Sequence, residues 1–167
     1  QPPLHPPRLP HRVAHSTPGA NPGVSGVAVD AEAGEVYLCQ QRNLAFKVSV
    51  WDTATGKLLR HWGDAELDTP HGIRIRHWGE RKEIWVADMG VGLPDTGNAI
   101  KVFHPNGSFI RAYGEVGHSG SSLSPLQFGH VADVDWMSDG KTAVAVDGDG
   151  GPNNRAVQFD ISSGETV

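Results

Sequence analysis

The chain has 167 residues, of which 38% are apolar, with 21 glycines and 12 prolines. Its net charge is −5 and its pI is near 5.9, which argues against a general basic surface of the kind that binds nucleic acid or an anionic membrane. No apolar run approaches the roughly 18 residues of a membrane-spanning helix. The sequence therefore predicts a globular chain with its own core, no nucleic-acid partner and no membrane span.

Residues 1–22 differ from the rest because they contain seven prolines and little apolar pattern. We expect an extended, partly polyproline II arm over 1–22, followed by a folded region over 23–167. The chain begins at Gln1 without a signal peptide, so we expect a mature or trimmed product.

Residues 23–167 repeat one unit at a spacing of roughly 40 to 60 residues. Its most compact form is GKLLRHWG (56–63) against GSFIRAYG (107–114), with a glycine at each end of both. The repeat predicts three units, 24–63, 70–114 and 131–167, the last of them incomplete.

Each unit contains short segments of alternating apolar character, separated by turn residues. The predicted strands are 25–30, 35–40, 46–52 and 57–62, then 72–77, 83–88, 99–104 and 108–113, then 132–137, 141–147 and 155–160. Four such strands per repeat are typical of a β-propeller blade. We therefore predict an all-β fold of about three four-stranded antiparallel blades.

Propellers usually have about four to eight blades, so three do not close a ring. We expect the chain to be part of a larger ring of about six blades; the alternative is a ring completed by other chains. In such a meander the connections that vary in length all fall at one end of the blades. Loops of that kind on a rigid scaffold usually carry function, so this loop-rich face is the expected binding surface.

The segments PHGIRI (70–75), KEIWVADMG (82–90) and AIKVFHPNGSFIRAYG (99–114) resemble the NHL repeat, a short propeller blade. VADMGVG, SLSPLQF, VADV and DGDGGPNNR are similar to segments of a secreted member of that family. The resemblance implies an NHL-type β-propeller and an extracellular location.

A second resemblance is to the peptidyl-hydroxyglycine amidating lyases, NHL-type enzymes with a similar P-H-G-L segment. It implies that His71 is a zinc ligand and that the carbonyl of Ile73 faces calcium. The equivalent positions of the other two repeats hold Ser25 and Ala132, and Asp149 stands where the lyases have a catalytic tyrosine. No catalytic residue is therefore assigned.

Two further positions are candidate sites. Asp147 and Asp149 lie in a glycine-rich segment whose oxygens suit calcium, although a turn capped by Asp and Asn is the favoured alternative. Asn106 opens the sequon Asn106-Gly107-Ser108 on a predicted turn, which makes it a candidate N-glycosylation site.

The leading hypothesis is a secreted, non-catalytic NHL propeller that binds a protein, a glycan or a neighbouring subunit through its loop-rich face. The alternatives are a zinc- or calcium-dependent lyase of the amidating type and, ranked last, an RNA-binding NHL domain, because the long loops are acidic.

The first strands of the repeats also carry charges. Aligning them predicts that Arg74 pairs with Asp135 and Arg76 with Asp30 across neighbouring blades, because arginine binds a carboxylate through two parallel hydrogen bonds. The alternative is two solvated arginines in a wet channel.

Overall fold

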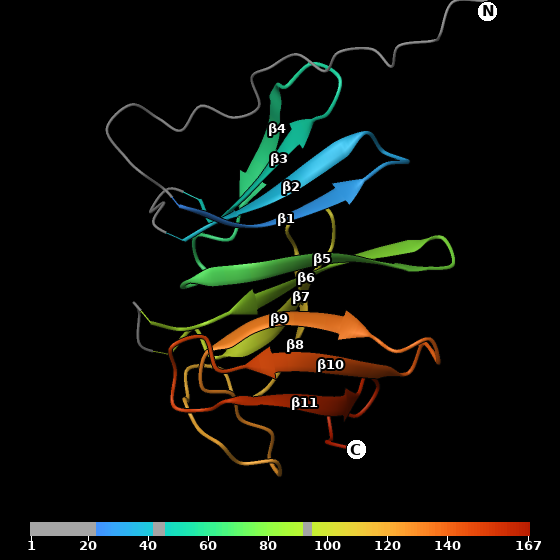
Figure 1. Ribbon diagram of the computed structural model, residues 1–167. Coiled ribbons are helices and arrows are strands. Elements are labelled where there is room, and N and C mark those ends of the chain that lie inside the picture. The colour runs from blue at the N-terminus through green and yellow to red at the C-terminus, as the bar shows by residue number, and fades with distance from the viewer. Residues whose placement is uncertain (1–22, 42–45, 92–94) are drawn as a thin grey trace, which may run out of the picture.

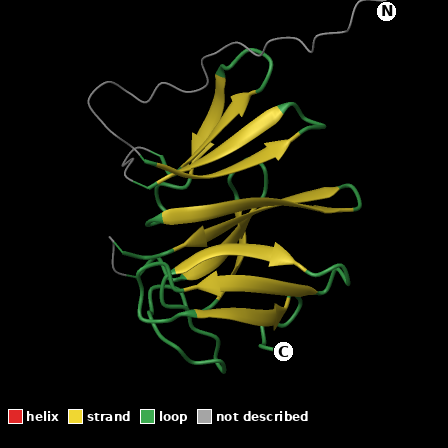
Figure 2. Ribbon diagram, viewed as in Figure 1, coloured by secondary structure: helices red, strands yellow, loops and turns green. Residues whose placement is uncertain are grey.

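The computed structural model describes residues 23–41, 46–91 and 95–167. The predicted arm, residues 1–22, lies outside this range. The described residues form three antiparallel sheets and no helix (Figure 2). Their strands are β1 (Val24–Asp30), β2 (Glu35–Gln40), β3 (Val48–Asp52), β4 (Leu58–Trp62), β5 (Pro70–Trp78), β6 (Arg81–Asp88), β7 (Ala99–Phe103), β8 (Phe109–Tyr113), β9 (Val131–Trp136), β10 (Thr142–Asp147) and β11 (Arg155–Asp160).

The three sheets are successive blades. Their strand orders are β1-β2-β3-β4, β5-β6-β7-β8 and β9-β10-β11, so each strand pairs with its neighbour in the sequence. The sheets stack one above another in Figure 1, and β5 lies between β1 and β9 and contacts both. The predicted all-β fold of successive antiparallel blades is confirmed. No described segment is a helix long and apolar enough to cross a membrane.

The core lies between the blades. One apolar cluster joins the first two blades around Tyr37, Trp62 and Phe103, and a second joins the last two around Trp85 and Phe159. Each of these side chains is at least nine-tenths buried. Because every blade packs one sheet face against the next blade, the stack has two core layers and no single centre.

The repeated arginine of the GKLLRHWG and GSFIRAYG segments forms an ion pair within its own blade. Arg60 donates to both carboxylate oxygens of Glu35 at 2.7 Å. In the second blade a single nitrogen, Arg111 Nη2, donates to both carboxylate oxygens of Glu83, at 3.0 and 3.1 Å. The second and fourth strands of a blade do not pair directly, so this side-chain contact bridges the third strand between them.

The closing glycine of the same segments is needed for two reasons. Gly63 and Gly114 have φ values of +93° and +88°, which side chains rarely adopt. A Cβ at Gly63 would also lie 2.8 Å from Leu67 Cδ1, and one at Gly114 would lie 2.6 Å from Phe128 Cδ2. The chain can therefore turn sharply out of β4 and β8 while an apolar side chain packs over the turn.

The predicted charge pairs between blades are wrong in their partners. Arg74 pairs with Asp133, not Asp135. A Cβ at Gly72 would lie 2.6 Å from Asp133 Oδ1, so this carboxylate lies in space that Gly72 leaves free.

The partner predicted for Arg76 is also wrong. Asp30 accepts a hydrogen bond from Lys82 Nζ at 2.7 Å, and Arg76 donates to the carbonyl of Gly140. Neighbouring blades do form ion pairs with each other, but alignment of the repeats does not identify which residues pair.

Candidate functional site

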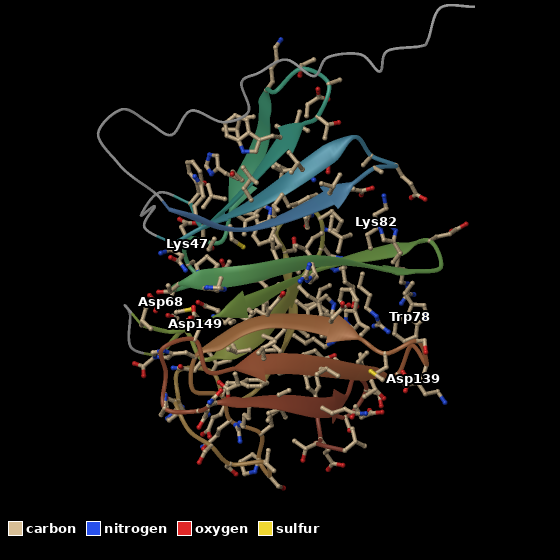
Figure 3. All side chains as sticks on the ribbon, in the orientation of Figure 1. Lys47, Asp68, Trp78, Lys82, Asp139 and Asp149 are labelled. Carbon is tan, nitrogen blue, oxygen red and sulfur yellow. The ribbon has the colours of Figure 1, made fainter. Side chains whose placement is uncertain are left out.

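The variable connections gather at one end of the blades, the loop-rich face. It includes the connection over 63–69 and the described parts of those over 89–98, 114–130 and 148–154. Lys47, Asp68 and Asp149 lie at this end, on the left of Figure 3, and Trp78, Lys82 and Asp139 lie at the opposite end. The strand order therefore places the longer loops on one face, as predicted.

Two buried aspartates hold these loops in place. Asp88, which ends β6, accepts hydrogen bonds from the backbone N–H groups of Asp68 and Thr69, at 2.9 and 2.6 Å. Lys101 lies 3.0 Å away from the same carboxylate. Burial raises the pKa of Asp88, while Lys101 and the two N–H groups oppose that shift.

Asp147, which ends β10, has the same role in the third blade. Its carboxylate accepts from the Gly129 N–H, the Asn153 amide and Arg155 Nε, at 2.8, 2.8 and 3.0 Å. The residue is fully buried. Three donors thus occupy its oxygens, and Asp147 anchors the loop rather than facing the solvent.

His71 and Asp149, both candidates from the sequence, are brought together at the opening of β5. His71 Nε2 lies 2.9 Å from Asp149 Oδ2, and its Nδ1 lies 3.1 Å from the Ala132 carbonyl. Both ring nitrogens therefore face acceptors. The imidazole joins the second blade to β9 and to the 148–154 loop of the third blade.

Ile73 lies beside them in the chain, but its side chain belongs to the core between the first two blades and is 2% exposed. A cleft of about 280 Å³ opens along these first strands, lined by Ser25, Gly26, His71, Arg74, Ala132 and Asp133 among others. Its polar side chains include the Ser25 hydroxyl, which donates to the Pro70 carbonyl, the His71 ring and the Arg74–Asp133 ion pair.

The donor set at this cleft does not fit zinc. A catalytic zinc takes three protein ligands, and no three His, Cys, Asp or Glu side chains converge on one point anywhere in 23–41, 46–91 or 95–167. Ser25 and Ala132, at the positions equivalent to His71, supply no imidazole. The roles of His71, Ile73, Asp147 and Asp149 in metal binding stay predictions.

Asn106 lies at the opposite end of the blades, in the turn between β7 and β8. The residue is exposed, and its Oδ1 accepts a hydrogen bond from the Ser108 N–H at 3.0 Å. Its amide nitrogen is thus on the outside of a tight turn, a position that glycosylation requires.

Sequence reasoning missed the basic partners of the buried aspartates, Lys101 and Arg155. Each stands near the start of the strand that follows an aspartate-ended strand. The signal was present as D-M-G…A-I-K and D-G-D…N-R, but only the pairing of adjacent strands shows that the two ends meet.

Comparisons with known proteins agree with this architecture, although no protein-family model matches the chain. The human protein named NHL repeat-containing protein 3 is 36% identical over 133 residues. The mouse protein of that name has the same identity over the same length. The matched part covers 80% of this chain but 37% of either relative, so the chain spans little more than a third of their length.

Among solved structures, hydrazine synthase from Kuenenia stuttgartiensis matches with a TM-score of 0.58 and 26% identity. The match covers 85% of this chain and 35% of that one. The repeated antiparallel blades fit the 36% identity to proteins named for NHL repeats. The chain therefore belongs to the NHL-repeat family of β-propellers.

Proposed function

We propose that the chain is a secreted, non-catalytic segment of an NHL propeller that binds a partner protein through its loop-rich face. The observation that supports this most is how that face is built. Buried Asp88 and Asp147 fix the loop bases, while Val91 and Val116 on the same loops are 53% and 38% exposed. Exposed apolar side chains on a rigid scaffold are typical of a protein interface.

The acidic character of the face fits a protein partner better than RNA. The described loops carry Glu66, Asp95, Glu115 and Asp149, none of which is buried. An RNA-binding surface needs the opposite sign of charge. We therefore keep RNA binding as the least favoured alternative.

The test is a comparison of two variants of the immobilised chain. Val91→Asp combined with Val116→Asp alters the loop-rich face, and Phe109→Asp is a matched change of an exposed residue on the outer strand β8. We expect specific proteins from extracellular fluid to be lost with the loop variant and retained with Phe109→Asp, as measured by quantitative mass spectrometry. Equal retention by both variants would refute a binding role for this face.

The glycosylation sequon at Asn106, which supports the secretory assignment, is tested separately. Expressed behind a secretory leader in a eukaryotic cell, the chain should carry an N-glycan that peptide-N-glycosidase removes, and Asn106→Gln should lack it. An unmodified Asn106 in the secreted chain would remove the sequon as support for secretion.

A further inference from the structure

A second surface, at the end of the blades opposite the loop-rich face, is a cleft with exposed apolar walls. It lies between the end of β5 and the turn over 137–141, and its volume is about 340 Å³. Trp78 and Met137 line it and are 59% and 47% exposed. Figure 3 shows Trp78 at this end, near Asp139 of the neighbouring turn.

The blade fold does not require a tryptophan at this position. Strand β5 has nine residues, against seven in β1 and six in β9, so its hairpin with β6 is the longest of the three. The strand registers align Trp78 with Glu32 and Asp139 in the turns of the other two blades. A charged side chain serves both of those turns, so the exposed indole beside Met137 points to a contact with another segment.

Trp78 is held in position on one side. The guanidinium of Arg76 lies 4.3 Å from the centre of the Trp78 ring, which is a cation–π contact. Arg76 itself is 6% exposed and donates to the Gly140 carbonyl. An exposed tryptophan fixed in advance loses little entropy on binding, which favours its use as a contact residue.

The chain itself contains a segment that suits such a surface. Residues 1–22 lie outside the described residues, and five of their seven prolines fall in PPLHPPRLP, over 2–10. This segment includes two P-x-x-P units, over 3–6 and 7–10. A polyproline II helix has three residues per turn and therefore places both prolines of such a unit on one edge. Grooves lined by aromatic side chains bind these helices, because a preformed helix loses little entropy.

The arm is long enough to bring this segment to the cleft. It precedes β1, which starts at the loop-rich end and runs for seven residues, about 23 Å, toward the opposite end (Figure 1). There Asp30 accepts from Lys82, in the hairpin that carries Trp78. The cleft lies beyond β5, further by about 10 Å, the spacing of stacked sheets. Residues 11–22 span about 37 Å as polyproline II, so the segment over 2–10 can reach the cleft.

The charges of the arm and of the rest of the chain are opposite. Of the chain's 14 basic and 19 acidic residues, the arm holds Arg8 and Arg12 and no acid. Residues 23–167 therefore hold 12 basic and 19 acidic residues, a net charge of −7. This difference attracts the arm to the surface of its own domain before any specific contact forms.

We propose that the arm of this chain docks in the cleft, with the segment over 2–10 as a polyproline II helix whose proline rings lie on Trp78 and Met137. Because the arm is tethered, its effective concentration at the cleft is about millimolar, so a weak contact is enough. The docked arm covers Trp78 and keeps other apolar segments away from it. The proposal concerns a different face and does not rest on the protein-binding function.

The experiment measures the distance between arm and cleft by NMR. A nitroxide spin label is attached to Gln1→Cys in the ¹⁵N-labelled full-length chain, and the native Cys39 is fully buried and should not react. The chain without Gln1→Cys, treated in the same way, checks that point. We expect the label to remove the indole N–H signals of Trp78 and Trp136, and its chemical reduction to restore both.

Variants of the arm test the part played by the prolines. Changing Pro3, Pro6, Pro7 and Pro10 to alanine keeps the length of the arm but removes the rings and the preformed helix, so both indole signals should return. Pro18→Ala is the matched change of a proline in the tether, and the signals should stay lost.

Variants of the cleft test the other side of the contact. Trp78→Ala should restore the Trp136 signal in the presence of the label. Phe109→Ala, a change of a similarly exposed aromatic outside the cleft, should leave both indole signals lost. The dispersion of the remaining amide signals shows that each variant is folded.

Three results would overturn the proposal. Indole signals that persist beside the label would mean that the arm does not reach the cleft, and loss of the Val91 and Val116 amide signals instead would place it on the loop-rich face. Signal loss that survives the fourfold proline variant would mean that the prolines do not bind. Loss in a ¹⁵N chain without a label, mixed with an unenriched labelled chain, would assign the arm to a second copy.

Discussion

The ion pair between Arg74 and Asp133 joins the second blade to the third, and its contribution to stability can be measured. Arg74 Nε lies 3.1 Å from Asp133 Oδ1, and the side chains are 43% and 34% exposed. We expect Asp133→Asn to lower the free energy of unfolding by about 0.5 to 1 kcal/mol, the range of half-exposed ion pairs. Asp135→Asn should have no effect, and urea denaturation measures both. A larger loss with Asp135→Asn would restore the pairing expected from the repeat alignment.

Glu35 gives the chain a defined acid sensitivity. The hydrogen bonds from Arg60 lower the pKa of Glu35 from its ordinary 4.5, and burial opposes them. A lowered pKa in the folded state stabilises the fold above about pH 4.5, and this stability is lost as the pH falls through the lower folded-state value. Glu35→Gln should therefore show a smaller drop in Tm between about pH 5.5 and pH 3 than the wild-type chain.

The control for this prediction is Glu80→Gln, a change at an exposed glutamate in the turn after β5. It should keep the wild-type slope of Tm against pH. Parallel slopes for the wild type and Glu35→Gln would mean that the Arg60 pair contributes no acid sensitivity.

Zinc binding can be tested at the His71 imidazole on the loop-rich face. His71 Nε2 faces Asp149. If zinc binds here, His71→Ala should lower the zinc content measured by elemental analysis after dialysis. His118→Ala, a change at an exposed histidine of a neighbouring loop, should not. Equal zinc in the wild type and His71→Ala would remove the site.

The close approach of the first strands of neighbouring blades sets the shape of the stack. A Cβ at Gly72 would lie 2.6 Å from the Ala132 carbonyl oxygen, an atom of the β9 backbone. We expect Gly72→Ala to lower stability by about 1 to 3 kcal/mol, because β5 and β9 must separate. Gly79→Asn tests a glycine with φ of +57° and open space around it, and should be nearly neutral. Thermal unfolding compares the two; equal Tm values would contradict the crowding.

At the level of elements the sequence was a good guide, for a physical reason. Alternating apolar residues bounded by glycines determine where a strand begins and ends, and the observed strands lie within two residues of the expected bounds. The side-chain pairs were not predictable in the same way. Arg60 reaches Glu35 across the third strand, and Arg74 reaches Asp133 because Gly72 leaves room, and neither fact is visible in a single repeat.

The first blade exposes a sheet face whose equivalents in the other blades are core. Val27 pairs with Leu38 as Ile73 pairs with Val86 and Val134 with Ala145. Yet Val27 is 56% exposed, whereas Ile73 and Val134 are each 2% exposed. Val29, on the same face, is 60% exposed. The face therefore has the residues of a contact between blades, but no blade formed by residues 23–41, 46–91 and 95–167 packs against it.

From this we predict that the isolated chain associates through the first blade. Exposed apolar area on a sheet face is removed from water at about 25 cal/mol per Å² when a second surface covers it. The apparent mass in light scattering should rise with concentration for the wild-type chain, and Val27→Lys combined with Val29→Lys should keep it at the monomer value. Val116→Lys, which adds a positive charge on the loop-rich face, should still associate. A wild-type chain that stays monomeric at all protein concentrations would show that this face is stable in contact with solvent. Association that persists in the double variant would mean that the contact lies on another surface.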